Sequence, residues 1–95
     1  MPTIGPKCVE NNRAASRFEL IEEGLTAFAD YYPRGESLVI PHVESPLPLR
    51  GKGTAGRLML GVAQLARQDS LKLIPTCSYA VAWFRRHPEW KDVLA

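Results

Sequence analysis

Side chains able to accept a proton or to attack a carbonyl group follow two predicted strands. His42 and Glu44 stand at the end of a strand predicted over residues 37–43, and Cys77 follows a strand predicted over residues 71–76. An imidazole or a carboxylate can serve as a general base. A thiol at the start of a helix gains thiolate character, because the helix N-terminus favours negative charge. These residues are therefore candidates for acid–base or nucleophilic catalysis.

Each candidate also has a purely structural interpretation. His42 shares the predicted strand face of Leu38 and Ile40, so it is either a packed core histidine or a solvent-facing base. Cysteines are most often buried and inert, and position alone favours that interpretation for Cys77. Cys8, near the N-terminus, has no comparable argument for reactivity.

A glycine-rich segment, residues 50–55, precedes a predicted helix and combines a permissive backbone with positive charge. Gly51 and Gly53 allow backbone N–H groups to approach a phosphate closely, and the helix N-terminus favours negative charge. Arg50 and Lys52 add counter-charge. The segment indicates a phosphate-binding loop, and the alternative is a close-packed turn.

Two familiar nucleotide loops are excluded. Gly51, Gly53 and Gly56 match the dinucleotide pattern G-x-G-x-x-G, but the proline-rich residues 44–49 separate them from the preceding strand. A dinucleotide loop follows its strand directly, and this chain is also too short for a doubly wound sheet. The Walker pattern fails because Lys52 is followed by glycine and not by serine or threonine.

The spacing of apolar residues predicts the elements that position these candidates. The predicted order is strand, strand, strand, helix, strand, helix. The strands cover residues 17–22, 25–32, 37–43 and 71–76, turns lie at 23–24 and 33–35, and the second helix covers 78–86. The first helix begins in the glycine loop and ends at Asp69 and Ser70. The aromatic residues interpreted as core or core-edge are Tyr31, Tyr32, Tyr79, Trp83 and Trp90.

The fold predicted from this order is α/β with a small mixed sheet. The first two strands form an antiparallel hairpin, and the strand–helix–strand unit over residues 37–76 is parallel and right-handed. Residues 1–14 are an arm or a short first strand, and residues 1–95 form a single domain. Because parallel strands end at the same edge of a sheet, the topology brings His42, Glu44, Cys77 and the glycine loop together.

Two prolines add a geometric expectation at that edge. Pro41 and Pro75 lie near the ends of the two predicted parallel strands, and each removes a backbone donor. Weakened pairing would splay the strands and open a cleft with free backbone groups. The alternative is that a proline marks an edge strand or a bulge.

Composition limits the classes of function. Of the 95 residues, 45% are hydrophobic and 23% are charged, and no long apolar run predicts a membrane span. Twelve basic against ten acidic residues argue against bulk nucleic-acid binding. The pairs Arg50–Lys52 and Arg85–Arg86 suit a phosphorylated small molecule better than a duplex. With no secretory-type N-terminus and two cysteines, a cytoplasmic protein is expected.

A family resemblance follows from six segments in a fixed order. They are RFEL, LTAFADYY, HVESP, LRGKGTA, LKLIPTCSY and RRHPEW. With these segments the sequence resembles a small family of short GNAT acyl-CoA N-acetyltransferases from about Arg17 to Leu94. The most specific segment, LRGKGTA, fits the phosphate-binding pattern Arg/Gln-x-x-Gly-x-Gly/Ala at Arg50, Gly53 and Ala55.

The resemblance implies acetyl-CoA as the cofactor and an amine, on a small molecule or a protein, as acceptor. The residues implied to hold the coenzyme A pyrophosphate are Arg50, Gly51, Lys52, Gly53, Thr54 and Ala55. The pantetheine arm would lie between splayed strands, with the acetyl group near His42, Glu44 and Cys77. Glu44 or His42 would be the base, and a backbone N–H near Val43 would polarise the thioester.

The sequence also departs from the wider superfamily. Cys77 stands where an asparagine is common, and Trp83 or Phe84 stands where a tyrosine often protonates the leaving thiolate. Cys77 either lines the thioester site or carries the acetyl group transiently. The missing tyrosine and the short chain leave two rival functions, a coenzyme A-binding module with little turnover and a protein-interaction domain with a vestigial loop.

Overall fold

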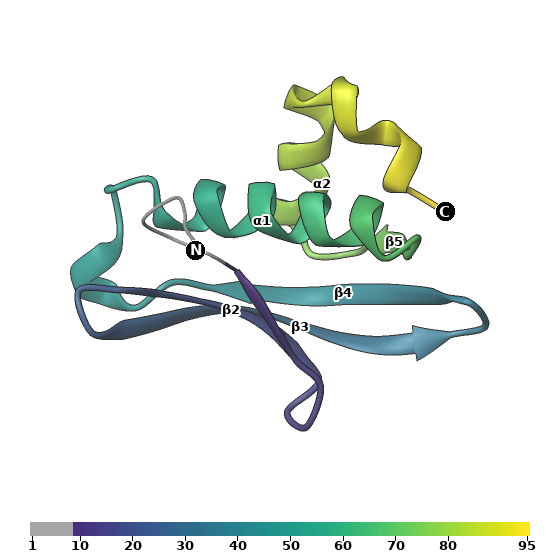
Figure 1. Ribbon diagram of the computed structural model, residues 1–95. Coiled ribbons are helices and arrows are strands. Elements are labelled where there is room, and N and C mark those ends of the chain that lie inside the picture. Colours follow the sequence, from purple (N-terminus) through teal and green to yellow (C-terminus); the bar gives the residue numbers. More distant parts are fainter. Residues whose placement is uncertain (1–8) are drawn as a thin grey trace.

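The computed structural model describes residues 9–95, which form a five-stranded sheet in the order β1-β2-β3-β4-β5 with two α-helices (Figure 1). The elements are β1 (Glu10–Asn12), β2 (Arg17–Glu22), β3 (Leu25–Arg34), β4 (Ser37–Glu44), the 3₁₀ turn η1 (Leu47–Leu49), α1 (Thr54–Gln68), β5 (Lys72–Pro75), α2 (Ser78–Arg86) and the 3₁₀ turn η2 (Pro88–Val93). Strands β1 to β4 pair antiparallel, and β4 pairs with β5 in parallel. The predicted α/β fold with its hairpin and its strand–helix–strand unit is confirmed. Within the predicted arm or short first strand over residues 1–14, Glu10–Asn12 form the short strand β1. Cys8 lies outside the described residues.

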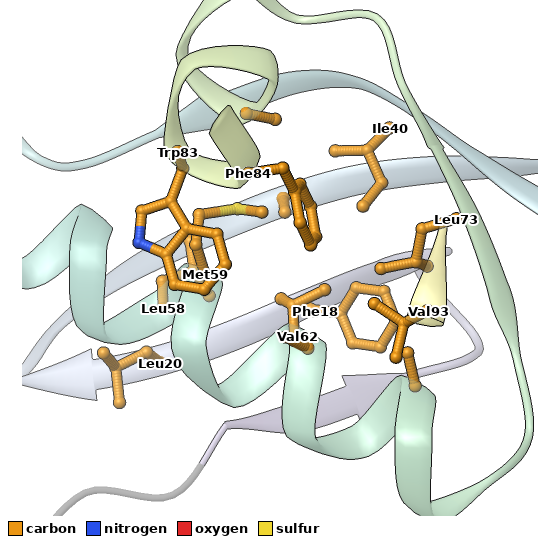
Figure 2. Packing of buried hydrophobic residues seen from close by; sticks show 14 of the residues in the cluster. Phe18, Leu20, Ile40, Leu58, Met59, Val62, Leu73, Trp83, Phe84 and Val93 are labelled. Carbon is orange, nitrogen blue, oxygen red and sulfur yellow. The ribbon is translucent and has the colours of Figure 1, made fainter. Parts of the chain in front are cut away.

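Both helices lie on the same face of the sheet (Figure 1). Helix α1 packs over β2 and β3, and α2 packs over β4 and β5. Figure 2 shows their apolar side chains meeting those of the strands, with Trp83 and Phe84 beside Met59. Burying such side chains is the main source of stability in a domain of this size. No helix in residues 9–95 is long and apolar enough to cross a membrane.

The hairpin joining β3 and β4 is tighter than predicted. Strand β3 continues through Pro33 and Arg34, which the sequence analysis had placed in a turn. Proline, which has no backbone N–H, is tolerated there because the pairing of β3 with β2 ends at Asp30. On that side of β3, position 33 has no neighbouring strand to which an N–H would donate. The turn is reduced to Gly35 and Glu36, and Gly35 adopts the positive φ of 60° that a two-residue turn of this kind requires.

A β-bulge reverses the face on which His42 was predicted. The register between β3 and β4 shifts between Asp30 and Tyr32, so two residues of β4 oppose one of β3 around Pro41. After the bulge Val43 pairs with Ala29, which is fully buried under the helices. Because side chains alternate along a strand, His42 points to the opposite face. The expectation that His42 shares a face with Leu38 and Ile40 is therefore wrong.

The parallel pairing of β4 with β5 stops where the prolines predicted it would. The last pair is Ile40 with Pro75, and the next two amides, of Thr76 and Cys77, both donate to the Ile40 carbonyl oxygen. Within the described chain, residues 41–44 of β4 have no strand partner on that side. Pro41 lies in the bulge and Pro75 ends the parallel ladder, so the bulge and the weakened pairing are confirmed, whereas the cleft between the strands stays a prediction.

Candidate active site

The glycine loop turns sharply into α1. Gly51 and Gly53 have φ angles of 81° and 83°, which side chains with a Cβ rarely adopt. Helix α1 begins at Thr54, and its first backbone bond runs from the Arg57 amide to the Gly53 carbonyl oxygen. The preceding amides, of Thr54, Ala55 and Gly56, have no acceptor within the helix. They form a donor set of the kind that binds phosphate.

A buried carboxylate fastens this loop to the sheet. Glu22, only 4% exposed, accepts hydrogen bonds from Thr54 Oγ1 at 2.6 Å and from Arg57 Nε and Nη2 at 2.7 and 2.9 Å. Arg57 Nη2 also donates to the Lys52 carbonyl oxygen at 2.9 Å. The bond from Glu22 raises the pKa of the Arg57 guanidinium, which stays charged. The last residue of β2 thus sets the position of the helix start.

The pair of Glu22 and Arg57 was not predicted, although the sequence contains one signal for it. Phe18 and Leu20 alternate toward the core, and the same alternation places the charged Glu22 on the buried face. A carboxylate is buried only when it is paired, so a cation had to lie nearby. Nothing in the sequence identified Arg57 as that cation.

We expect Glu22→Gln to lower the free energy of unfolding by about 1–3 kcal/mol, because charge-assisted bonds to a buried group are lost. Urea denaturation measures this change. Glu23→Gln is the matched control, since Glu23 pairs with Lys52 at 3.2 Å in solvent, and such exposed pairs contribute less than about 1 kcal/mol. Equal effects of the two substitutions would contradict the role given to Glu22.

An open cavity of about 230 Å³ lies beside the loop. It is lined by Ser45, Leu49, Arg50, Gly51, Gly53, Thr54, Ala55, Gly56 and Tyr79. Ser45 Oγ is buried in the protein and makes no hydrogen bond there. Burial raises the pKa of Tyr79 despite the nearby charge of Arg86, so its hydroxyl remains a donor. Ser45 and Tyr79, which the sequence analysis did not assign to the site, are thus available to a ligand.

The cavity fits a coenzyme A pyrophosphate by the chemistry of its walls. Glycines at positive φ leave the backbone accessible, and the amides at the start of α1 supply donors. Arg50, whose Nε donates to the Ser45 carbonyl oxygen at 3.1 Å, adds a cation at the rim. Ser45 Oγ supplies a hydroxyl with no partner in the protein.

Three residues assigned to the cofactor do not line this cavity. Lys52 directs its ammonium group to Glu23, away from the helix start. Val43 and Cys77 lie beyond the last pair of the parallel ladder instead. The structure therefore divides the predicted cofactor residues between the loop and the strand ends.

His42 and Glu44 are brought together on the sheet face opposite the helices. His42 Nε2 and Glu44 Oε1 lie 2.9 Å apart, and the two side chains are 51% and 47% exposed. Since a carboxylate only accepts, Nε2 carries the proton and Nδ1 is left as the basic atom. Phe28, from β3, lies beside the imidazole with 6.1 Å between ring centres.

Cys77 shares the edge but not the face of this pair. It is the N-cap of α2, makes no side-chain cap bond, and packs partly buried against the core. Its backbone amide is bonded to Ile40, two residues before His42. Trp83 and Phe84, one of which the resemblance places where a tyrosine is common, are core residues at 3% and 6% exposure. Neither can supply a proton.

Comparison with known proteins identifies the family. The model of the family described as GCN5-related N-acetyl-transferase matches residues 17–93, so the chain belongs to that family. A solution NMR structure from Staphylococcus aureus, described as a GCN5-like candidate N-acetyltransferase, matches with a TM-score of 0.62 at 22% identity. The match covers 97% of this chain and 91% of that one, and at this identity it shows a common fold. The GNAT resemblance of the sequence is thereby confirmed.

Proposed function

We propose that the protein transfers an acetyl group from acetyl-CoA to an amine. The observation that supports this most is the glycine loop, where amides, Arg50 and the unpartnered Ser45 hydroxyl surround one cavity at the start of α1. Membership of an N-acetyltransferase family supports the class of reaction. When bound, acetyl-CoA supplies a thioester whose carbonyl carbon an amine can attack.

Cofactor binding and proton transfer take place on opposite faces of the sheet. The loop amides and Tyr79 bind the phosphate end on the helix side. Residues 41–44 lie beyond the last pair of β4 with β5, and an amide near Val43 polarises the thioester carbonyl there. His42 Nδ1 accepts the proton of the acceptor amine on the opposite face. Glu44 orients the ring and stabilises the imidazolium that forms. No dedicated acid is required, because a thiolate is a good leaving group.

A binding experiment and a transfer experiment test the proposal separately. Calorimetry with coenzyme A and with acetyl-CoA measures binding, and thiol release in the presence of a panel of small-molecule and peptide amines measures transfer. Binding with amine-dependent release supports the enzyme. Binding without transfer to any amine would favour the rival module, for which the absence of a tyrosine at Trp83 and Phe84 is the specific argument. We propose the cytoplasm as the compartment, because two cysteines are too few for a disulfide framework.

We expect Cys77→Ala to retain most of the activity and wild-type protein to form no acetyl adduct at this thiol. The thiol packs against the core on the helix side, whereas His42 and Glu44 face the other side. An amine attacking the thioester directly gains little from a second thioester of similar energy. Mass spectrometry after incubation with acetyl-CoA checks the adduct. Acetyl-Cys77 that passes its acetyl group to an amine at the turnover rate would overturn this expectation.

A further inference from the structure

The sheet face away from the helices surrounds His42 with side chains of the neighbouring strands (Figure 1). Arg17 of β2 pairs with Asp30 of β3, and Asp30 pairs with His42 of β4. Residues that pair directly across antiparallel strands point to the same face, so these three side chains form one row on it. The adjacent row consists of Glu19, Phe28 and Glu44. Asp30 is therefore the direct cross-strand neighbour of the proposed base.

The other carboxylates of these two rows already have partners. Arg17 Nε donates to Glu19 Oε2 at 2.6 Å, and this bond lowers the pKa of the Glu19 carboxyl. The guanidinium group of Arg17 also lies 4.5 Å from the centre of the Phe28 ring. The remaining glutamate is bonded to the proposed base. The Asp30 side chain, by contrast, forms no hydrogen bond or ion pair with any of residues 9–95.

Asp30 thus gives this face a charge that a substrate can neutralise. The residue is partly buried, and a carboxylate there attracts a cation more strongly than one in open solvent does. Neighbouring strands lie about 5 Å apart, so a molecule whose nitrogen meets His42 Nδ1 has the Asp30 carboxylate about this far away. The Phe28 ring, whose centre lies 6.1 Å from that of the imidazole, adds apolar surface for carbon atoms between the two points.

We propose that the acceptor is a short diamine and that Asp30 selects it by binding the protonated amino group that does not react. The proposal rests on the proposed function, because it requires an amine to react at His42. The uncharged nitrogen forms the amide bond as the carbon–sulfur bond of the thioester breaks, its proton passes to His42 Nδ1, and the sulfur leaves as the thiolate. The second nitrogen keeps its proton and donates a charge-assisted hydrogen bond to the Asp30 carboxylate.

Three amines of equal chain length test this selection. At the position of the second amino group, 1,3-diaminopropane carries an ammonium group, 3-amino-1-propanol a neutral hydroxyl group and β-alanine a carboxylate. Because the amines differ in their own reactivity, the quantity to compare between protein variants is the ratio of kcat/KM for the diamine to kcat/KM for the amino alcohol. In Asp30→Asn we expect this ratio to fall about fivefold, chiefly through a higher KM for the diamine. The corresponding ratio for β-alanine should rise, because a repulsive charge is removed.

Glu10→Gln is the matched control for the charge of this face. Glu10 pairs with Glu19, so it lies on the same face as Asp30, but on β1 at the edge of the sheet. It is about 14 Å from the strand of His42, because three strand spacings separate β1 from β4. We expect this variant to keep the wild-type ratios for all three amines. Rates with the amino alcohol control for folding, since Asp30→Asn should leave them at the wild-type value.

Several results would overturn the assignment of Asp30 while leaving the proposed function intact. They are a diamine ratio that Asp30→Asn leaves unchanged, an equal loss with the diamine and the amino alcohol, and an equal fall in Asp30→Asn and Glu10→Gln. An equal fall for 1,6-diaminohexane, whose nitrogens lie further apart, would contradict the short spacing, and transfer to peptide amines alone would exclude the diamine. Failure of wild-type protein to acetylate any amine would instead overturn the proposed function, and the assignment of Asp30 with it.

Discussion

Replacing Gly53 with valine is expected to weaken coenzyme A binding at least about a hundredfold, because several charge-assisted bonds to the pyrophosphate are lost together. At a φ of 83° a β-branched residue is strained. Its Cβ would also lie 3.0 Å from Arg57 Nη1, so the guanidinium group that holds the loop to Glu22 must shift. The amides that precede α1 then no longer converge on one anion. Calorimetry with coenzyme A measures the loss.

Gly35→Val is the control for the effect of backbone strain alone. Gly35 also has a positive φ, of 60°, and a Cβ there meets no atom within 4 Å. It lies in the hairpin between β3 and β4, away from the loop. We expect this variant to lose stability but to bind coenzyme A as the wild type does. Wild-type affinity in a folded Gly53→Val protein, shown by its circular dichroism, would contradict the phosphate-binding assignment.

Local sequence patterns predicted those elements whose signals lie within a few residues of one another. The pair Glu23 and Gly24 predicted the first hairpin, and both residues have the positive φ angles that a tight two-residue turn needs. The second helix was predicted at its observed bounds, residues 78–86, because Pro75 ends the strand before it and Pro88 follows closely after it.

The face of His42 was not predictable, because a strand pattern is read with an unbroken period of two. Counting from Leu38 and Ile40 places His42 under the helices. The bulge at Pro41 inserts one residue and reverses every later position of β4. The proline was recognised as a possible bulge, yet its consequence for the catalytic candidates depends on pairing with β3, a contact that no local pattern specifies.

The geometry of the glycine loop likewise depends on distant contacts. Glycines and cations predicted an anion site from the loop itself, but the carboxylate that fixes the loop, Glu22, precedes Arg57 by 35 residues. Lys52 was interpreted as counter-charge for the phosphate, but in the structure it forms an ion pair with Glu23. Ion pairs between distant residues form only when the chain folds. Composition therefore shows which charged residues exist, but not which of them stay unpaired and able to bind a ligand.

His42→Ala is expected to lower kcat for amine acetylation by about a hundredfold or more, the usual contribution of a general base. Glu44→Gln should lower it by about tenfold, since glutamine still accepts the Nε2 proton but no longer stabilises an imidazolium. The double variant should be no worse than His42→Ala, because the two side chains act as one unit through their 2.9 Å bond. Steady-state rates with a reactive amine measure all three.

The affinity for coenzyme A separates this catalytic role from a structural one. His42 and Glu44 lie on the face opposite the helices, about half exposed, so neither substitution should change binding at the loop or the stability of the core. Glu36→Gln, in the exposed turn between β3 and β4, is the control and should keep the wild-type kcat. A greater loss of kcat in Glu44→Gln than in His42→Ala would make the carboxylate the base and the imidazole its support. Wild-type kcat in the double variant would show that neither His42 nor Glu44 takes part in proton transfer.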